Sequence, residues 1–452
     1  MQDASRREAL ASAEFLLAPE LTLLPQGPVA GLGVVVRDGR FADIGALPEV
    51  ATRHPHLVPV DLPQRLLMPG FIDAHHHLTQ SFGKALAFGE PSEIFRRIWV
   101  PLEGSLDPQG LYLSAKLAAL EALRGGFTTI TDAGTRATVG LEAIAEATQE
   151  VGVRCVLAKI CNDDGSRHAE VLAEAERFLA QRGPLRHPSL AVSIPEVATD
   201  AMLQAASRLS AEAGVAFQVH VNEHLASVER SLVARGLRPL QHLASAGALG
   251  PQALLAHCTM LTPEEMLLLR DTGSAVALNP VASPWKGNAV APSELLARLG
   301  VRLGMGTDGT RSDAFRMMDA AESNQRLAYG LSSGDSVCGR GHLWLDIATR
   351  GGADAVGLSG ITGEVATGKA ADFLLIDLDQ PEMTPSWDLR WELVRLASRA
   401  QIESVHVQGR LRLWHGWPVD WDARALLAEV RQVAQREVAR APIHKVVSLR
   451  CP

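Results

Sequence analysis

Two histidines separated by one residue end an apolar stretch early in the chain, within Pro69-Gly70-Phe71-Ile72-Asp73-Ala74-His75-His76-His77. Side chains alternate between the two faces of a strand, so His75 and His77 point the same way and His76 points elsewhere. Two imidazoles in this arrangement at the end of a strand can share one metal ion. A histidine-rich surface tract is the alternative, and the apolar residues that lead into the pair argue against it.

Three further apolar stretches end in residues that bind metals or transfer protons. His220 ends one of them and is followed by Glu223, His257 ends another, and Asp308 follows the third. Alone, each has a simpler explanation, because a strand-end histidine is usually a core residue and a strand-end aspartate usually caps a helix. Together with the first pair they offer a divalent ion nitrogen and oxygen donors and leave room for water, as a catalytic metal site does. The expected ligands are His75, His77, His220 and Asp308.

Eight short apolar segments between residues 70 and 306 alternate with longer segments of helical pattern. This alternation is typical of parallel βα units, and eight of them suit an α/β fold of the (β/α)8 TIM-barrel type. Active sites of that fold lie at the carboxyl ends of the strands, where the expected metal ligands fall. The expected strands are Gly70–Ala74, Thr128–Asp132, Arg154–Lys159, Leu190–Ile194, Ala216–Val221, Ala253–His257, Ser274–Leu278 and Arg302–Gly306.

The two ends of the chain are expected to form a second, smaller domain. Hairpin patterns around Asp38-Gly39 and Gln408-Gly409 indicate strands in residues 10–68 and 366–418. We therefore predict one composite β-sandwich domain, with the barrel, residues 69–365, inserted between its halves. Residues 419–452 are predicted to be a C-terminal helix and tail. The apolar face of that helix carries Leu426, Leu427, Val430 and Val433.

Composition limits the class of function. The 452 residues carry a net charge of −8 and give a pI near 6.0, which argues against a nucleic-acid or membrane-surface binder because both need a basic face. Five scattered cysteines without a CxxC pair indicate free thiols in a reducing compartment. Neither a signal-peptide core nor a run of about 18 apolar residues occurs. We expect a cytoplasmic enzyme.

In their order along the chain, these motifs resemble the signature of the amidohydrolase superfamily. The resemblance rests on the segment from Pro69 to His77, on His220 with Glu223, on His257 and on Gly306-Thr307-Asp308. The pattern is most similar to the branch that contains guanine, cytosine and adenosine-type deaminases and the s-triazine hydrolases. Members of that branch use one metal ion.

The number of metal ions depends on a lysine. Superfamily members with two ions carry a modified lysine at the end of the fourth strand, where this chain has Ile194-Pro195-Glu196. Lys159 ends the third strand, and we interpret it as structural. One ion is therefore expected, with zinc as the first choice and iron as the alternative.

The resemblance also implies roles for the site residues. The four ligands hold the ion, which activates a water molecule as a hydroxide nucleophile. Asp308 takes a proton from that water and later passes one to the leaving amine. Glu223 protonates the ring nitrogen beside the attacked carbon, and His257 hydrogen-bonds the hydroxide and the tetrahedral oxygen.

Three residues are candidates for substrate binding. Gln80 is placed like a glutamine that meets the ring amide in guanine-type deaminases, although a loop glutamine facing water is equally open. Trp285 stacks on a flat ring in one interpretation and caps the barrel edge in the other. Glu196 stands where many of these deaminases have a histidine. A carboxylate there suits an N–H-rich 2-amino-lactam edge and disfavours adenosine-type substrates.

We therefore predict an aminohydrolase that releases ammonia from a small aromatic nitrogen heterocycle. Nucleobases such as guanine, cytosine and isocytosine, pterins and aminotriazines are the expected substrate classes. A dechlorinating triazine hydrolase or a cyclic amide hydrolase stays open, because the same activated water serves all three reactions. A catalytically inactive barrel scaffold is disfavoured, because all the expected ligands are present. The family resemblance alone suggests a homodimer.

Overall fold

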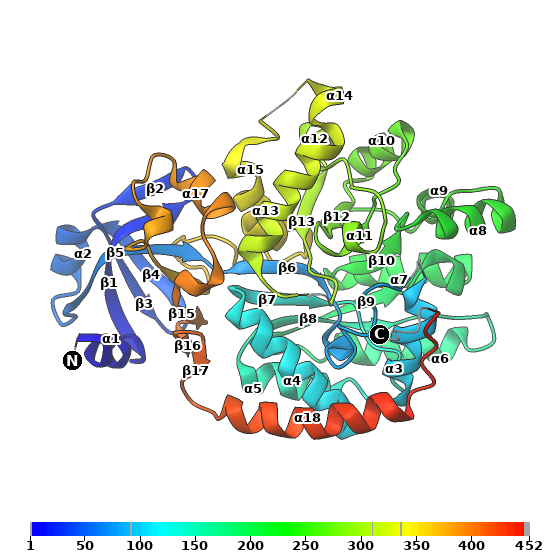
Figure 1. Cartoon of the computed structure of the whole chain (residues 1–452), viewed down its shortest axis with the longest axis horizontal. Helices are drawn as coiled ribbons and strands as arrows, with labels where there is room; N and C mark the ends of the chain where they lie inside the picture. The colour runs from blue at the N-terminus through cyan, green and yellow to red at the C-terminus, as the bar shows by residue number, and fades with distance from the viewer. Residues whose placement is uncertain (1, 91–92, 310, 335–336, 447–452) are drawn as a thin grey trace, which may run out of the picture.

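The structure is a computed structural model that describes residues 2–90, 93–309, 311–334 and 337–446. Figure 1 shows two parts side by side, a β-rich part that contains the N-terminus and a barrel of strands surrounded by helices. No helix in these ranges is both long and apolar enough to cross a membrane. Cys155, Cys161, Cys258 and Cys338 in these ranges are buried and form no disulfide with one another, and Cys451 lies outside the described residues.

The barrel sheet has eight strands, and in it each strand lies next to its neighbour in sequence. All seven pairings between successive strands are parallel. The strands are β6 (Phe71–His76), β7 (Phe127–Asp132), β8 (Arg154–Ile160), β9 (Arg186–Val192), β10 (Phe217–Val221), β11 (Ala253–His257), β12 (Ala275–Leu278) and β13 (Arg302–Met305). Each expected segment overlaps one of these strands, and together they bring the carboxyl ends to one edge.

Helices follow the strands and cover the outside of the barrel. Between β6 and β7 lie the π-helix η2 (Phe95–Trp99), α3 (Val100–Ser105) and α4 (Pro108–Arg124). The others are α5 (Glu142–Val151), α6 (His168–Leu179), α7 (Asp200–Ala213), α8 (Leu225–Arg235), α9 (Pro239–Ser245), α10 (Pro263–Thr272), α11 (Ala282–Trp285), α12 (Ser293–Arg298), α13 (Ala314–Gln325), α15 (Arg340–Ala348) and α16 (Arg350–Ala355).

The fourth strand of the barrel differs from its expected position. β9 begins at Arg186, earlier than the expected Leu190, and contains Pro188. A proline has no N–H to donate, which argues against a central strand. Here β9 pairs with β8 along its length but with β10 only from Leu190 onward, so Pro188 lies in the part that has a neighbour on one side alone.

The first and last strands of the barrel meet at a seam. A Cβ atom added to Gly304 of β13 would lie 2.7 Å from Cβ of Ala74 in β6, so the two backbones are in close contact. Beyond the end of β13, the backbone N–H of Asp308 donates to the carbonyl oxygen of His75 at 2.9 Å. The barrel thus closes at the level of the expected metal ligands.

The β-rich part is one mixed sheet with strands from both ends of the chain, in the order β17-β16-β15-β14-β5-β1-β3-β4, with β2 paired to β1. Its strands are β1 (Glu14–Leu24), β2 (Gly27–Ala30), β3 (Leu32–Arg37), β4 (Arg40–Ala46), β5 (Pro59–Pro69), β14 (Phe373–Asp377), β15 (Ile402–Val407), β16 (Arg410–Trp414) and β17 (Trp417–Pro418). Apolar residues of β1, β3, β5, β14 and β16 share one core cluster. The helices α1 (Gln2–Leu10) and α2 (Leu47–Arg53) pack beside the sheet, and α17 (Leu389–Arg395) packs against α13 and α15 of the barrel.

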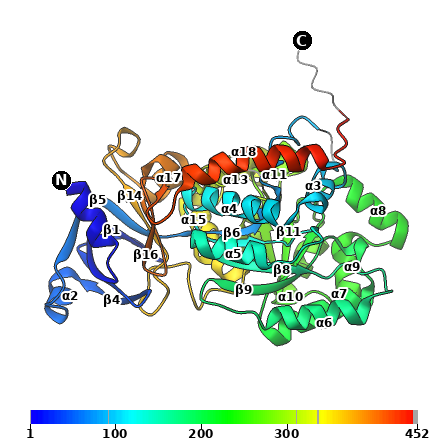
Figure 2. The ribbon, with the colours of Figure 1, turned by 90° about the horizontal axis from the view of Figure 1, so that it is seen from below.

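The last helix, α18 (Ala423–Arg440), runs along the barrel across α4 and α3 (Figure 2). Its buried face includes Leu426, Val430 and Val433, as the sequence predicted, while Leu427 is only partly buried. The tail that follows contacts the segment around η2, where the backbone N–H of His444 donates to the carbonyl of Arg97 at 3.0 Å. The far end of the chain is thereby attached to the loops above the barrel.

Candidate active site

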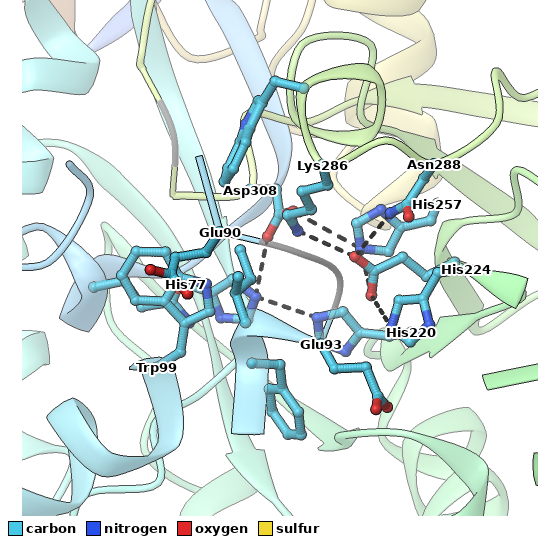
Figure 3. Close-up of a pocket in the computed structure, with 15 residues that line it drawn as sticks. His77, Glu90, Glu93, Trp99, His220, His224, His257, Lys286, Asn288 and Asp308 are labelled. Carbon is cyan, nitrogen blue, oxygen red and sulfur yellow. Dashed lines mark hydrogen bonds and ion pairs between the residues drawn. The ribbon is translucent and has the colours of Figure 1, made fainter. Parts of the chain in front are cut away.

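The four expected metal ligands converge at the carboxyl end of the barrel, and Figure 3 shows three of them, His77, His220 and Asp308. Nε2 of His77 lies 3.2 Å from Nε2 of His220 and 3.4 Å from Oδ1 of Asp308, which is 3.6 Å from the ring of His75. An ion with tetrahedral ligands at about 2.1 Å separates the ligand atoms by about 3.4 Å. The spacing of these atoms therefore fits a single divalent ion.

The hydrogen-bonding of the imidazoles fits an ion as well. Nδ1 of His220 donates to the carbonyl oxygen of Ser193 at 2.6 Å, which leaves the lone pair of Nε2 directed into the site. Nε2 of His75 is buried without a hydrogen-bond partner among the described residues. A buried polar atom without a partner is costly, and coordination would satisfy it. Zinc and iron both accept such a set of nitrogen and oxygen donors.

A buried carboxylate at the seam supports the ligands from behind. The two oxygens of Asp73 accept hydrogen bonds from the backbone N–H and the hydroxyl of Thr307, at 3.0 and 2.6 Å. His76 points into the same cluster, 2.7 Å from the Thr307 hydroxyl, and so away from the metal ligands. This cluster joins the end of β6 to the end of β13 and positions His75 and Asp308 relative to each other.

The backbone at the site is strained. Asp308 has φ of 52° and His257 has φ of 74°, in the left-handed region that residues with a Cβ rarely adopt. Such conformations persist where the surrounding structure imposes them, and they gather at functional sites.

Glu223 and His257 lie beside the ligands, where the resemblance placed them. Nε2 of His257 is 3.7 Å from Oε2 of Glu223 and 3.9 Å from Oδ2 of Asp308. Nδ1 of His257 is 3.2 Å from the amide nitrogen of Asn279, which donates to it, so the proton of the neutral ring sits on Nε2. His257 can therefore donate a hydrogen bond toward the space between the two carboxylates.

The charges at the site influence one another. Burial lowers the pKa of His257 to about 4, so the ring is neutral at pH 7. Burial also acts to raise the pKa of both carboxyl groups, but His257 and Lys286 together outweigh it at Glu223, and Lys286, His75 and His257 together outweigh it at Asp308. Both pKa values fall below the usual range, so both groups are carboxylates near neutral pH.

The site opens into a cavity under the loop that includes η2. Its lining contains the flat side chains of Phe95, Trp99 and Trp285, together with polar groups from the strand ends. Nε1 of Trp285 is buried without a hydrogen-bond partner in the described residues. A mostly enclosed space with aromatic walls and a few convergent polar groups is the usual form of a small-molecule site.

The sequence as a whole matches a known family. Residues 66–412 match the Amidohydrolase family, which is more than half of the chain. The chain belongs to the amidohydrolase family. Among its relatives, the 8-oxoguanine deaminase of Pseudomonas aeruginosa is 31% identical over 95% of this chain and 100% of the relative. The 5-methylthioadenosine/S-adenosylhomocysteine deaminase of Syntrophobacter fumaroxidans is 28% identical over 92% of this chain and 94% of the relative.

Solved structures agree on the fold of this amidohydrolase. An adenosine deaminase from Xanthomonas campestris with bound zinc superposes with a TM-score of 0.85 at 24% identity, over 94% of this chain and 98% of that one. The atrazine chlorohydrolase of Arthrobacter aurescens, in complex with zinc, gives a TM-score of 0.82 at 19% identity, over 93% and 100%. The predicted family and the predicted α/β barrel are therefore confirmed.

Of the three residues predicted to bind substrate, two line the cavity of this amidohydrolase. Gln80 lies in the lining, and its amide nitrogen donates to Oε1 of the buried Glu103 at 3.0 Å, which leaves its carbonyl oxygen for other contacts. Trp285 also lies in the lining, where its ring meets that of Phe88 edge-on at 5.2 Å. Trp285 stays a candidate for stacking on a flat ring, with capping of the barrel edge as the alternative.

The third residue, Glu196, does not lie in the lining. It belongs to the short 3-10 helix η3 (Pro195–Val197) after β9, and both its carboxylate oxygens are buried without a hydrogen-bond partner in the described residues. The expected contact between this carboxylate and an N–H-rich substrate edge is not what the structure presents. The peptide turns into η3 directly after β9, and the neighbouring Ser193 and Ile194 take the place at the edge of the site.

Sequence reasoning missed three parts of the amidohydrolase site. The sequence analysis assigned no role to Lys286, yet its amine contacts both Glu223 and Asp308. The pair of Arg136 and Glu103, which supports Gln80, joins α3 to the loop after β7, and neither carries a motif. The segment around η2 and the C-terminal tail also carry no motif that would have marked them. The one available signal in the sequence was the position of Lys286 directly after Trp285.

Proposed function

We propose that this amidohydrolase is an aminohydrolase that releases ammonia from an aromatic nitrogen heterocycle, with one bound zinc ion. One observation carries the proposal. Asp308 turns Oδ1 toward the ligands His75 and His77 and Oδ2 toward His257 and the cavity, so one carboxylate joins the metal site to the place where protons move. The 8-oxoguanine and methylthioadenosine deaminases among the relatives support this reaction class.

The ligands His75, His77, His220 and Asp308 would hold the ion. When bound, it supplies the positive charge that lowers the pKa of a water molecule from 15.7 toward roughly 7. The zinc bound in two structures of similar fold supports zinc over iron.

The residues of the chain account for the movement of protons. Addition of water to the amino-bearing carbon needs one proton on the neighbouring ring nitrogen and a second on the leaving amine. In our proposal Glu223, beside the cavity, accepts one proton of the water and delivers it to the ring nitrogen. Asp308 accepts the second proton and passes it to the amine, which leaves as ammonia. His257 donates through Nε2 to the oxygen that becomes the product carbonyl. Transfers of this kind typically contribute about 10²- to 10⁴-fold each.

The cavity walls suggest how the ring is held. Gln80, with its amide nitrogen already bound to Glu103, presents a carbonyl oxygen that accepts from a ring N–H, as a lactam edge offers. Trp285 and Phe95 provide apolar surface for a flat ring. We therefore propose amino-lactam heterocycles, of the guanine or 8-oxoguanine type, ahead of adenosine-type substrates.

Ammonia release by the zinc-loaded protein tests the proposal. The panel contains guanine, 8-oxoguanine, isocytosine, cytosine, pterins, adenosine, 5-methylthioadenosine and aminotriazines. We expect a substrate with kcat/KM above about 10⁴ M⁻¹s⁻¹, the lower end for effective enzymes, and no turnover by Asp308→Asn. Full zinc occupancy without ammonia from any compound would contradict the proposal. Chloride release from chlorotriazines or opening of cyclic amides would then identify the alternative reactions.

A further inference from the structure

The amine of Lys286 bridges the two carboxylates to which we assign proton transfer. Lys286 follows α11 in the loop after β12, and its Nζ donates to Oε1 of Glu223 at 3.1 Å and, more closely, to Oδ2 of Asp308. Figure 3 shows the side chain of Lys286 next to Asp308. Its side chain is only 13% exposed, so the contact is largely shielded from water.

Lys286 contacts one oxygen of each carboxylate, and the other oxygen of each carboxylate faces a histidine. Oδ1 of Asp308 faces His75 and His77, while Oδ2 faces Lys286. Oε2 of Glu223 faces His257, while Oε1 faces Lys286. A carboxylate can rotate about its last bond, and one fixed donor at one oxygen determines where the other oxygen points. Lys286 therefore fixes the orientation of both groups at once.

Lys286 also offsets the repulsion between the two carboxylates. Two buried carboxylates that share one cavity repel each other, and this repulsion favours protonation or separation of the pair. Other cations near the cavity are committed elsewhere, because Arg136 pairs with Glu103 at 3.2 Å and Arg230 pairs with Glu93. Lys286 contacts both members of the pair and offsets their charge at short range.

We propose that Lys286 is a positioning residue for proton transfer: it holds Glu223 and Asp308 together and orients them for their separate roles. The inference rests on the proposed aminohydrolase function. It assigns Lys286 no contact with the metal ion and no covalent step. Loss of the amine should therefore slow the chemical step while metal and substrate still bind.

The test compares zinc-loaded Lys286→Met with Lys116→Met, using the best substrate of the wild type. Lys116 is a matched control, because its side chain is 16% exposed, pairs with Glu150 at 2.6 Å and lies outside the cavity lining. We expect Lys286→Met to retain one zinc per chain, to keep KM within about threefold and to lose about 10²-fold in kcat, a typical loss for disturbed proton transfer. Lys116→Met should keep kcat within about threefold.

A second variant distinguishes the loss of the amine from a folding defect. Lys286→Cys is assayed before and after alkylation with bromoethylamine, which restores an amine of nearly the same length in the same protein. We expect alkylation to raise kcat at least tenfold, and alkylated wild type controls for reaction at other cysteines. An unchanged kcat in Lys286→Met, a loss confined to KM or zinc content, or no gain on alkylation would each overturn the proposal. An inactive wild type would instead refute the proposed function itself.

Discussion

The backbone N–H of Asp308 donates to the backbone carbonyl of His75 across 2.9 Å, and so joins the last strand of the barrel to the first. Both residues are candidate metal ligands. The site is therefore built at the seam where the barrel closes, and its geometry depends on how tightly the two strand ends approach. Gly306, two residues before Asp308, determines that approach. A Cβ atom there would lie 2.7 Å from the carbonyl oxygen of His75 and equally close to Oδ1 of Asn279.

Replacement of Gly306 by alanine should weaken both the fold and the metal site. The added methyl group meets backbone atoms that have little freedom to move, and overpacking of this kind costs about 1 to 3 kcal/mol. We expect a lower free energy of unfolding in urea and a zinc content well below one per chain. Gly360→Ala is the control, since a Cβ atom there has nothing within 4 Å. Full zinc occupancy and unchanged stability in Gly306→Ala would show that the seam is not the critical contact.

Replacement of Glu223 by glutamine should separate chemistry from metal binding. Glutamine keeps the shape of the side chain but cannot carry the proton, so we expect kcat to fall by about 10²- to 10⁴-fold. Zinc content, measured by elemental analysis, should stay at one per chain because Glu223 is not one of the four ligands. His220→Ala should instead lose the metal. A Glu223→Gln enzyme that keeps more than a tenth of wild-type kcat would contradict the role proposed here.

Because Gln80 lines the cavity and Glu196 does not, replacing these two residues should have different effects on the steady-state kinetics. Gln80→Leu removes the carbonyl oxygen from the cavity lining, and loss of a buried hydrogen bond of about 1 to 2 kcal/mol should raise KM for amino-lactams by about 5- to 30-fold. Glu196→Gln should leave kcat/KM within about threefold, because Glu196 lies outside that lining. Steady-state kinetics of the two variants on one substrate test both predictions. A large loss in Glu196→Gln would restore the carboxylate to the substrate site.

The C-terminal tail is expected to stabilise the cavity roof. Ile443 packs in one cluster with Ile94, Trp99 and Trp285, which line the cavity. A charge at Ile443 should loosen this cluster, so we expect Ile443→Asp to raise KM several-fold and to speed proteolytic cleavage near η2. Val446→Asp is a matched control in the same tail, because Val446 is 59% exposed. Equal KM values for the two variants would argue that the tail has no influence on substrate binding.

One buried histidine outside the site should make stability depend on pH. His406 stacks on Phe373 at 4.2 Å, and burial lowers its pKa to about 3. In the unfolded chain a histidine has a pKa near 6.5, so the unfolded state binds the extra proton and stability falls as pH drops from about 6.5 toward 3. Between pH 7 and pH 5 this amounts to about 2 kcal/mol. In urea unfolding, His406→Phe should therefore lose about 2 kcal/mol less unfolding free energy than the wild type between pH 7 and pH 5. An equal loss in both proteins would refute the assignment.

The sequence predicted the parts of this molecule that repeat or that carry a recognisable residue type. Eight apolar segments indicated the barrel, and histidines such as His220 stood at strand ends where the fold places chemistry. The contacts missed were between loops far apart in sequence. Nothing periodic marks Lys286 as facing Glu223, 63 residues away. Glu196, which lies outside the cavity lining, could not be placed from the sequence either, since the direction of a loop side chain depends on a turn that the local residues do not specify.

The pairing of β5 with β14 has a consequence for how this protein is made. These strands, the first ending at Pro69 and the second beginning at Phe373, are neighbours in one sheet. As the ribosome extends the chain, the edge of β5 stays without its partner until the whole barrel has emerged. An exposed apolar strand edge of this kind invites pairing with other chains. Newly made chains of this protein should therefore be most prone to aggregation late in synthesis, when the barrel is nearly finished and the last hundred residues are still missing.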